Sequence, residues 1–236
     1  MANNDGGPSA RFDALCRRAQ VLGLVVRGAF HPEPREFDKL LPAVGVGTIL
    51  LLGFTGSLQW EIYECSAEAS DGMPDPLDRR SRRVIGSLAD ELGALDVYPC
   101  GSAPQLPFQR LAARSESVHQ SPIGLLIHAR WGLWHAYRGA LVLADRIELP
   151  SVVPSVHPCA GCAAKPCLSA CPVRAFGADS FDLDACVNHV RSAAGSDCRE
   201  RGCLARRACP VGVQFSYVES QARFHMHAFL RAVPGP

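Results

Sequence analysis

Hydrophobic and polar positions alternate between helical and strand-like spacing over the first 145 residues of the chain. Residues 9–22 carry apolar side chains at helical intervals, which predicts an amphipathic helix. Residues 48–54 form a short apolar run bounded by glycines, which predicts a buried strand. The same rules predict helices at 57–67 and 106–116 and strands at 24–30, 95–98, 123–127 and 139–143.

A longer helix is predicted to begin at Asp75 and Pro76. An aspartate can accept hydrogen bonds from the free N–H groups of the first turn, and proline at the first helical position loses no needed donor. Apolar residues then recur at helical spacing up to Leu92, and Gly93 predicts the end of the helix. Residues 217–230 predict another amphipathic helix. Strands and helices that alternate in this way predict an α+β fold with a layered sheet.

The composition is that of an ordinary globular protein. The 236 residues are 47% hydrophobic and 20% charged, with a formal net charge of +1. Such a balanced charge argues against general binding of nucleic acid or of a membrane surface. No segment reaches the roughly 18 consecutive apolar residues of a membrane span. The first residues also lack the basic and apolar regions of a secretory signal. We therefore expect a cytoplasmic protein with no membrane or nucleic-acid partner.

Eleven cysteines are distributed unevenly along the chain. In a reducing cytoplasm thiols are more often ligands than disulfides, and an odd count leaves no complete pairing. Cys16, Cys65 and Cys100 are scattered and are expected to be small core residues. The other eight lie between Cys159 and Cys209, which predicts a metal-binding segment.

Three prolines within residues 150–158 predict a linker just before these eight cysteines. We therefore expect two domains, 1–150 and 151–236. The first is predicted to be a sheet-and-helix domain and the second a small ferredoxin-like domain with a C-terminal helix.

The first four cysteines of the segment are Cys159, Cys162, Cys167 and Cys171, with the spacing C-x2-C-x4-C-x3-C-P. Bacterial ferredoxins hold iron–sulfur clusters with the run C-x2-C-x2-C-x3-C-P. This chain keeps the closing proline and inserts two residues before the third cysteine. Structural zinc sites usually take two short-spaced pairs of ligands, and the proline has no role in them. The spacing is therefore more typical of a 4Fe–4S site than of zinc.

A second run has the spacing C-x4-C-x5-C-P, and one further cysteine lies between the two runs. In two-cluster ferredoxins the fourth cysteine of each run ligates the other cluster. Applied here, this crossover assigns one 4Fe–4S cluster to Cys159, Cys162, Cys167 and Cys209, and the other to Cys171, Cys186, Cys198 and Cys203. The widened spacings leave a single cluster or a zinc site open as alternatives.

The cysteine region resembles the iron–sulfur part of epoxyqueuosine reductase and of the reductive dehalogenases. Those enzymes pair two clusters with a cobalamin. An extra cysteine between their two runs serves the second cluster, and Cys186 falls at that place. The spacings here depart from the family pattern. By its length, this chain is not expected to carry the additional C-terminal domain of epoxyqueuosine reductase.

Three stretches within the first 155 residues resemble the CblC (MMACHC) family of cobalamin-processing proteins. They read FDKLLPAVGVGTILLLGF, DPLDRRSRRVIGSL and GLLIHARWGLWHAYRGALVLADRIELP. The resemblance implies a flavin-nitroreductase-like fold that binds cobalamin and removes its upper axial ligand, by reduction or by transfer to glutathione. That family has no cluster domain, so clusters fused to the fold favour electron delivery over glutathione transfer.

The resemblance also implies which residues contact the corrinoid. Gly124 matches a glycine whose backbone lies against the corrin, and Arg138 matches an arginine near the cobalamin and glutathione site. The same motif contains His128, Trp131, Gly132 and Trp134. Glycine permits close backbone approach, aromatic rings form an apolar wall, and arginine can hold a carboxylate or a carbonyl group. Each residue type also has an ordinary structural use, in the core or in a surface ion pair.

The leading hypothesis is an iron–sulfur corrinoid redox protein. An external donor, such as a flavodoxin, a ferredoxin or a reductase, would reduce the clusters. The clusters would then reduce cobalamin bound by residues 1–150, as cofactor or as substrate. Two alternatives stay open: a ferredoxin-type electron-transfer module without a corrinoid, and a flavin-dependent reductase that holds FMN.

Overall fold

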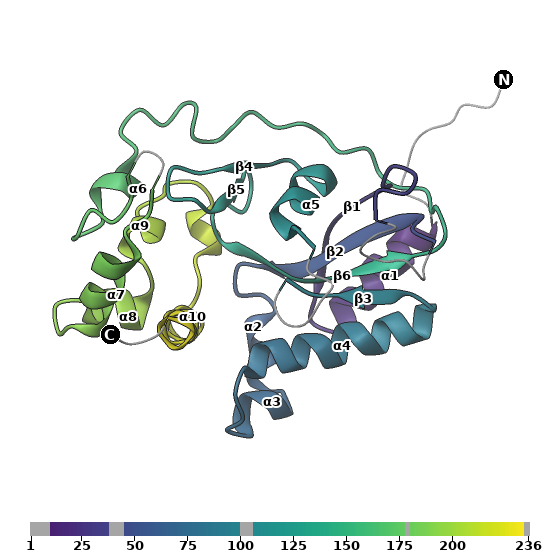
Figure 1. Cartoon of the computed structure of the whole chain (residues 1–236), viewed down its shortest axis with the longest axis horizontal. Helices are drawn as coiled ribbons and strands as arrows, with labels where there is room; N and C mark the ends of the chain where they lie inside the picture. The colour runs from purple at the N-terminus through teal and green to yellow at the C-terminus, as the bar shows by residue number, and fades with distance from the viewer. Residues whose placement is uncertain (1–9, 38–44, 100–105, 178–179, 234–236) are drawn as a thin grey trace. The chain divides into compact units, whose positions relative to one another are not determined.

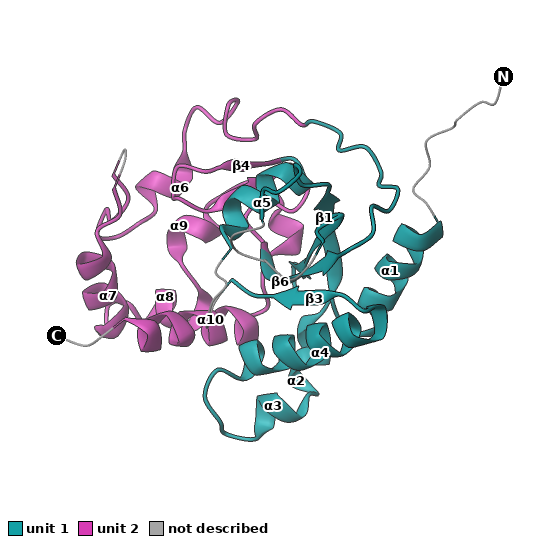
Figure 2. Ribbon diagram, turned by 45° about the vertical axis from the view of Figure 1, so that its right-hand side comes forward, with its two compact units in different colours: residues 1–117, 136–154 teal, residues 118–135, 155–236 magenta. Residues whose placement is uncertain are grey.

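The computed structural model describes residues 10–37, 45–99, 106–177 and 180–233. The chain divides into two compact units, shown in Figure 2. Unit 1 comprises residues 1–117 and 136–154, and unit 2 comprises residues 118–135 and 155–236. These units differ from the predicted division at residue 150, because the segment 118–135 is part of the cysteine-rich unit.

A four-stranded sheet forms the centre of unit 1, with strand order β1-β2-β6-β3 (Figure 1). β1 (Val25–Phe30) pairs antiparallel with β2 (Thr48–Thr55), and β3 (Leu95–Val97) pairs antiparallel with β6 (His135–Leu143). Every residue of β2 is buried. This burial explains why the strand is an apolar run without alternation, as the sequence predicts.

The helices of unit 1 are α1 (Ala10–Val21), α2 (Trp60–Glu64), α3 (Ala67–Ser70), α4 (Pro76–Leu92) and α5 (Phe108–Ser115). α4 ends as predicted, with Gly93 in the left-handed conformation at φ 59°. The predicted cap is wrong, because Asp75 has φ 50° and its side chain accepts no capping hydrogen bond.

The helix predicted at 57–67 is instead two short helices. The break falls at Cys65 and Ser66, where the Ser66 hydroxyl donates to the Tyr63 carbonyl oxygen at 2.6 Å. Such local side-chain hydrogen bonds compete with helix continuation. Cys65 is exposed, so its predicted place in the core is wrong, while Cys16 is partly buried. Cys100 lies outside the described residues.

Unit 2 begins with a two-stranded antiparallel sheet of β4 (Val118–Gln120) and β5 (Leu126–His128). The strand predicted at 123–127 is instead largely the turn between them, because Gly124 has φ 78° and the Ser121 amide donates to the Leu125 carbonyl at 2.9 Å. The elements that follow in the described part of unit 2 are α6 (Pro166–Ser169), α7 (Leu183–Arg191), α8 (Ser196–Arg201), α9 (Leu204–Arg207), a 3-10 turn (Val213–Phe215) and α10 (Glu219–Ala232). α10 packs against α8.

The mixture of strands and helices confirms the predicted α+β class. The flavin-nitroreductase-like type stays a prediction. Across the described ranges, no helix is both long and apolar enough to cross a bilayer.

Candidate iron–sulfur centre

All eight cysteines of the C-terminal segment lie in unit 2, and each is a free thiol. Cys167 lies in α6, Cys186 in α7 and Cys198 in α8, while Cys203 directly precedes α9. Cys167, Cys198 and Cys209 are buried, and the other five are partly buried. The short helices of unit 2 therefore carry or adjoin the thiols.

The thiols fall into two groups, defined by which neighbouring thiols raise the pKa of a given cysteine. Burial raises the pKa of Cys159, and neighbouring charge on the thiols of Cys209, Cys167 and Cys162 raises it further. Burial raises the pKa of Cys186 to about 11, with further contributions from Cys203, Cys171 and Cys198. These are the same two sets of four that the ferredoxin crossover predicts.

Backbone N–H groups point at several of these sulfur atoms. The Ala175 amide donates to Cys171 Sγ at 3.4 Å. Amides of Arg206 and Ala205 donate to the Cys203 sulfur, and each of these bonds acts to lower its pKa, although burial raises it overall. Such donors stabilise the thiolate, which is the form that binds metal. Hydrogen bonds to sulfur also tune the reduction potential of a cluster.

The geometry differs from that of a site for one ion. Among the described residues, no three His, Cys, Asp or Glu side chains are placed to hold a single metal ion. A 4Fe–4S core lies between its four thiolates, so these thiolates stand farther apart than the ligands of a single zinc ion. The grouping of the thiols and the N–H donors to sulfur fit a cluster.

Both departures from ferredoxin spacing have a local explanation in the structure. The two extra residues before Cys167 form a turn in which Lys165 has φ 39°, and Pro166 then begins α6. In the second run, a C-x3-C-P pattern would place a cysteine at position 205, which is instead the fully buried Ala205. The thiol of Cys198, from α8, joins that group in its place.

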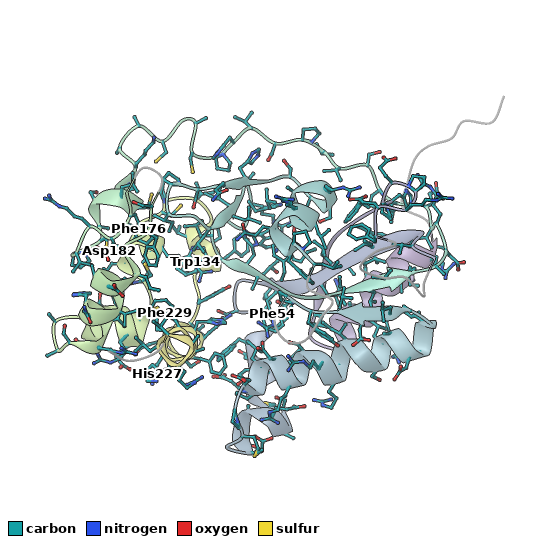
Figure 3. All side chains as sticks on the ribbon, in the orientation of Figure 1. Phe54, Trp134, Phe176, Asp182, His227 and Phe229 are labelled. Atoms are coloured by element: carbon teal, nitrogen blue, oxygen red, sulfur yellow. The ribbon has the colours of Figure 1, made fainter. Side chains whose placement is uncertain are left out.

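An open groove of about 520 Å³ lies beside the turn that contains Gly124. Gly124 has no heavy atom within 4 Å of the position where a β-carbon would point. Phe176 and Phe181 stack in the groove wall, with ring centroids 5.1 Å apart (Phe176 is labelled in Figure 3). Ser121 also lines the groove, and its hydroxyl is buried and has no hydrogen-bond partner among the described residues.

The residues at 128–132 are engaged within unit 2. Nδ1 of His128 accepts the backbone N–H groups of Arg130 and Trp131, at 3.0 and 3.2 Å. The Trp131 ring meets Phe215 edge to face, with centroids 4.5 Å apart. A β-carbon on Gly132 would lie 1.9 Å from the carbonyl oxygen of Val211. This part of the motif therefore packs against the segment that follows the second cysteine run.

Trp134 and Arg138 lie in different units. Trp134, labelled in Figure 3, is buried, and the Arg206 guanidinium lies 4.7 Å from the centre of its ring. Arg138 forms an ion pair with Asp78 and donates to the Ser81 hydroxyl at 3.1 Å. Of the six predicted corrinoid residues, Gly124 lines the open groove.

Sequence reasoning missed three residues around these sites: Ser121, Arg206 and Tyr217. Their residue types carry no motif signal, since a lone serine, arginine or tyrosine is common on any surface. Only the contacts of the folded chain single them out.

Comparison with family models and with curated proteins gives no match. Among solved structures, the chain is similar to epoxyqueuosine reductase from Streptococcus thermophilus, with TM-score 0.47, 13% identity, and coverage of 86% of this chain and 66% of that one. An epoxyqueuosine reductase bound to an epoxyqueuosine-modified tRNA-Tyr stem loop has TM-score 0.47, 14% identity, and coverage of 90% and 61%. The enzyme from Bacillus subtilis has TM-score 0.43, 14% identity, and coverage of 88% and 59%. The chain thus spans less than two thirds of the length of these neighbours.

Proposed function

We propose that this protein is a reductase-type iron–sulfur protein that holds two 4Fe–4S clusters in unit 2 and delivers their electrons to a bound corrinoid. The observation that carries the proposal is the division of eight thiols into two groups of four. One cluster takes Cys159, Cys162, Cys167 and Cys209, and the other takes Cys171, Cys186, Cys198 and Cys203.

The chain passes from one proposed ligand set to the other at two short connections, which supports electron transfer between the clusters. Cys167 and Cys171 are joined through α6 yet serve different clusters. Cys203 and Cys209 are joined through α9 and also serve different clusters. Two short connections therefore hold the clusters as neighbours, so that an external donor reduces one and that cluster reduces the other.

Support for the corrinoid comes from the groove and from the family resemblance. The groove beside Gly124 is open and has an aromatic wall, and it is lined by Ser121, whose buried hydroxyl has no partner in the described ranges. When bound, a corrinoid supplies a cobalt ion whose reduction expels its upper axial ligand. We assign Gly124 to the ring face, and we keep His128, Trp131, Gly132 and Trp134 as residues that shape unit 2 around it. Arg138 would require release from Asp78 to reach a ligand.

The test is an anaerobic ultraviolet–visible titration of the reconstituted full chain with cobalamin, alongside iron and sulfide analysis. We expect two clusters per chain and a spectral change on adding cobalamin. Clusters without affinity for cobalamin would instead identify an electron-transfer module, and a flavin spectrum would identify an FMN reductase.

One structural neighbour was solved with a tRNA stem loop, so the same titration is repeated with a tRNA stem loop. Tight binding there would overturn the expectation of no nucleic-acid partner.

A further inference from the structure

α9 is a single helical turn between a ligand of each proposed cluster. Cys203 precedes it, and the amides of Ala205 and Arg206 donate to the Cys203 sulfur. Cys209 follows it, and its own amide donates to the Arg206 carbonyl oxygen at 3.3 Å. The backbone of Arg206 therefore contacts both proposed ligands.

The Arg206 side chain fixes this turn to the segment 133–134. Its Nε and Nη2 atoms donate to the Leu133 carbonyl oxygen at 3.2 and 2.5 Å. The guanidinium carbon lies 4.7 Å from the ring centre of Trp134 and 4.4 Å from that of Tyr217. Arginine stacks on aromatic faces in this way while its planar fork directs its hydrogen bonds.

The anchoring point is itself buried. Leu133 is 2% exposed and belongs to the apolar cluster that contains Cys167, Cys209 and the fully buried Ala205. The neighbouring Gly132 packs on the backbone of Val211, two residues after Cys209. The Arg206 guanidinium thus links the α9 turn to the buried residues around the first proposed cluster.

The charge of Arg206 is not balanced by a nearby carboxylate. Among the described residues it forms no ion pair, and its partners are a carbonyl oxygen and two aromatic rings. The adjacent Arg207 differs, because it forms an ion pair with Asp197. A cluster gains negative charge on reduction, so an unbalanced cation nearby favours the reduced form.

We propose that Arg206 is a positioning residue for both clusters, which holds the α9 turn against Leu133 and Trp134 and raises the reduction potentials with its charge. This inference rests on the proposed two-cluster function. The step that it affects is the passage of one electron from the reduced cluster to the oxidised one. No bond is made or broken in that step, so its rate depends on the separation and the potentials of the clusters.

The test compares reconstituted full-length Arg206→Gln, Arg206→Lys and Arg231→Gln by redox titration with electron paramagnetic resonance detection. Arg231 is exposed near the end of α10, so its variant controls for the loss of one charge. We expect Arg206→Gln to keep two clusters, to lower both midpoint potentials and to change the line shape from the magnetic interaction between the clusters. Arg206→Lys should recover most of the shift in potential but keep the altered line shape, because it restores the charge and not the fork.

The inference is overturned if Arg206→Gln titrates at the wild-type potentials with an unchanged line shape, or if Arg231→Gln shifts the potentials equally. If Arg206→Gln does not retain both clusters, the line shape of Arg206→Lys decides instead. Absence of two clusters in the wild-type chain is a different result, because it refutes the proposed function itself.

Discussion

Gly132 and Val211 are in backbone-to-backbone contact, so close that a β-carbon on Gly132 would stand 1.9 Å from the Val211 carbonyl oxygen. Gly212 completes the contact, since a β-carbon there would lie 2.5 Å from the carbonyl carbon of Trp131. Both glycines have positive φ, 57° and 71°. The HARWGLW stretch and the segment after Cys209 therefore fit together only with glycine at both positions.

Replacing Gly132 by alanine should destabilise unit 2 strongly. The substitution adds the cost of a left-handed alanine, about 1 kcal/mol, to a collision with a backbone carbonyl that cannot move aside. We expect a total loss of about 3 kcal/mol or more, measured by denaturant unfolding, together with reduced cluster content. Gly124→Ala is the matched control, because Gly124 also has positive φ but has nothing within 4 Å of the added carbon. Equal losses for the two variants would contradict the contact.

Exchanging single cysteines should remove one cluster at a time. Cys209→Ser removes a proposed ligand of the first cluster, and Cys186→Ser removes one of the second. We expect each variant to retain about half of the iron, because each proposed set serves one 4Fe–4S cluster. Their resonance spectra should differ from each other. Cys65→Ser, at an exposed site in unit 1, should bind iron as the wild type does.

Much of the fold follows from local signals. β2 and α4 lie close to the predicted ranges because their apolar spacing and the terminal Gly93 act within a few residues. The place of residues 118–135 in unit 2 is different, because it depends on contacts such as that of Gly132 with Val211, almost eighty positions later. No periodicity encodes such a contact. The cysteine sets follow from the spacing that cluster ligation imposes, and their ligation of two clusters stays a prediction. The contacts of Arg206 have no such signal, because they depend on tertiary stacking.

Two substitutions in a buried charge network of unit 1 should lower the free energy of unfolding by different amounts. Arg27 donates to Glu116 at 2.8 Å, with side chains only 1% and 9% exposed, and the Tyr137 hydroxyl donates to the same carboxylate at 2.8 Å. Glu116→Gln leaves the Arg27 charge buried without its counter-ion and should cost about 3–5 kcal/mol. Tyr137→Phe removes one hydrogen bond and should cost about 1–2 kcal/mol. Thermal unfolding measures the loss of stability in each variant. A larger loss in Tyr137→Phe than in Glu116→Gln would contradict this prediction.

The Arg83–Glu68 pair should make unit 1 sensitive to acid. Hydrogen bonds from Arg83 lower the pKa of Glu68 from 4.5 to about 2. Because the folded-state pKa is depressed, the stabilisation is complete above pH 4.5 and is lost as the pH falls towards 2. The difference in unfolding free energy between wild type and Glu68→Gln should therefore shrink across that window. Glu64→Gln, at an exposed position on α2, is the control for the loss of one carboxylate. A difference for Glu68→Gln that stays constant down to pH 2 would contradict the prediction.

Replacing Ser121 by alanine should leave the stability of the ligand-free chain unchanged or higher, and should weaken ligand binding. Its hydroxyl is buried in the groove wall without a partner in the described part of the chain, so the ligand-free protein bears an uncompensated desolvation cost. Ser121→Ala should leave the ligand-free chain equally stable or more stable. If the groove holds the corrinoid, the hydroxyl can donate to one of its side-chain amide carbonyls, and the alanine variant should bind cobalamin up to about tenfold more weakly. Ser115→Ala is the comparison, because the Ser115 hydroxyl already donates to the Ala112 carbonyl at 3.1 Å. That variant should lose stability without loss of affinity, whereas a Ser121→Ala protein that binds cobalamin as the wild type does would place the ligand away from this wall.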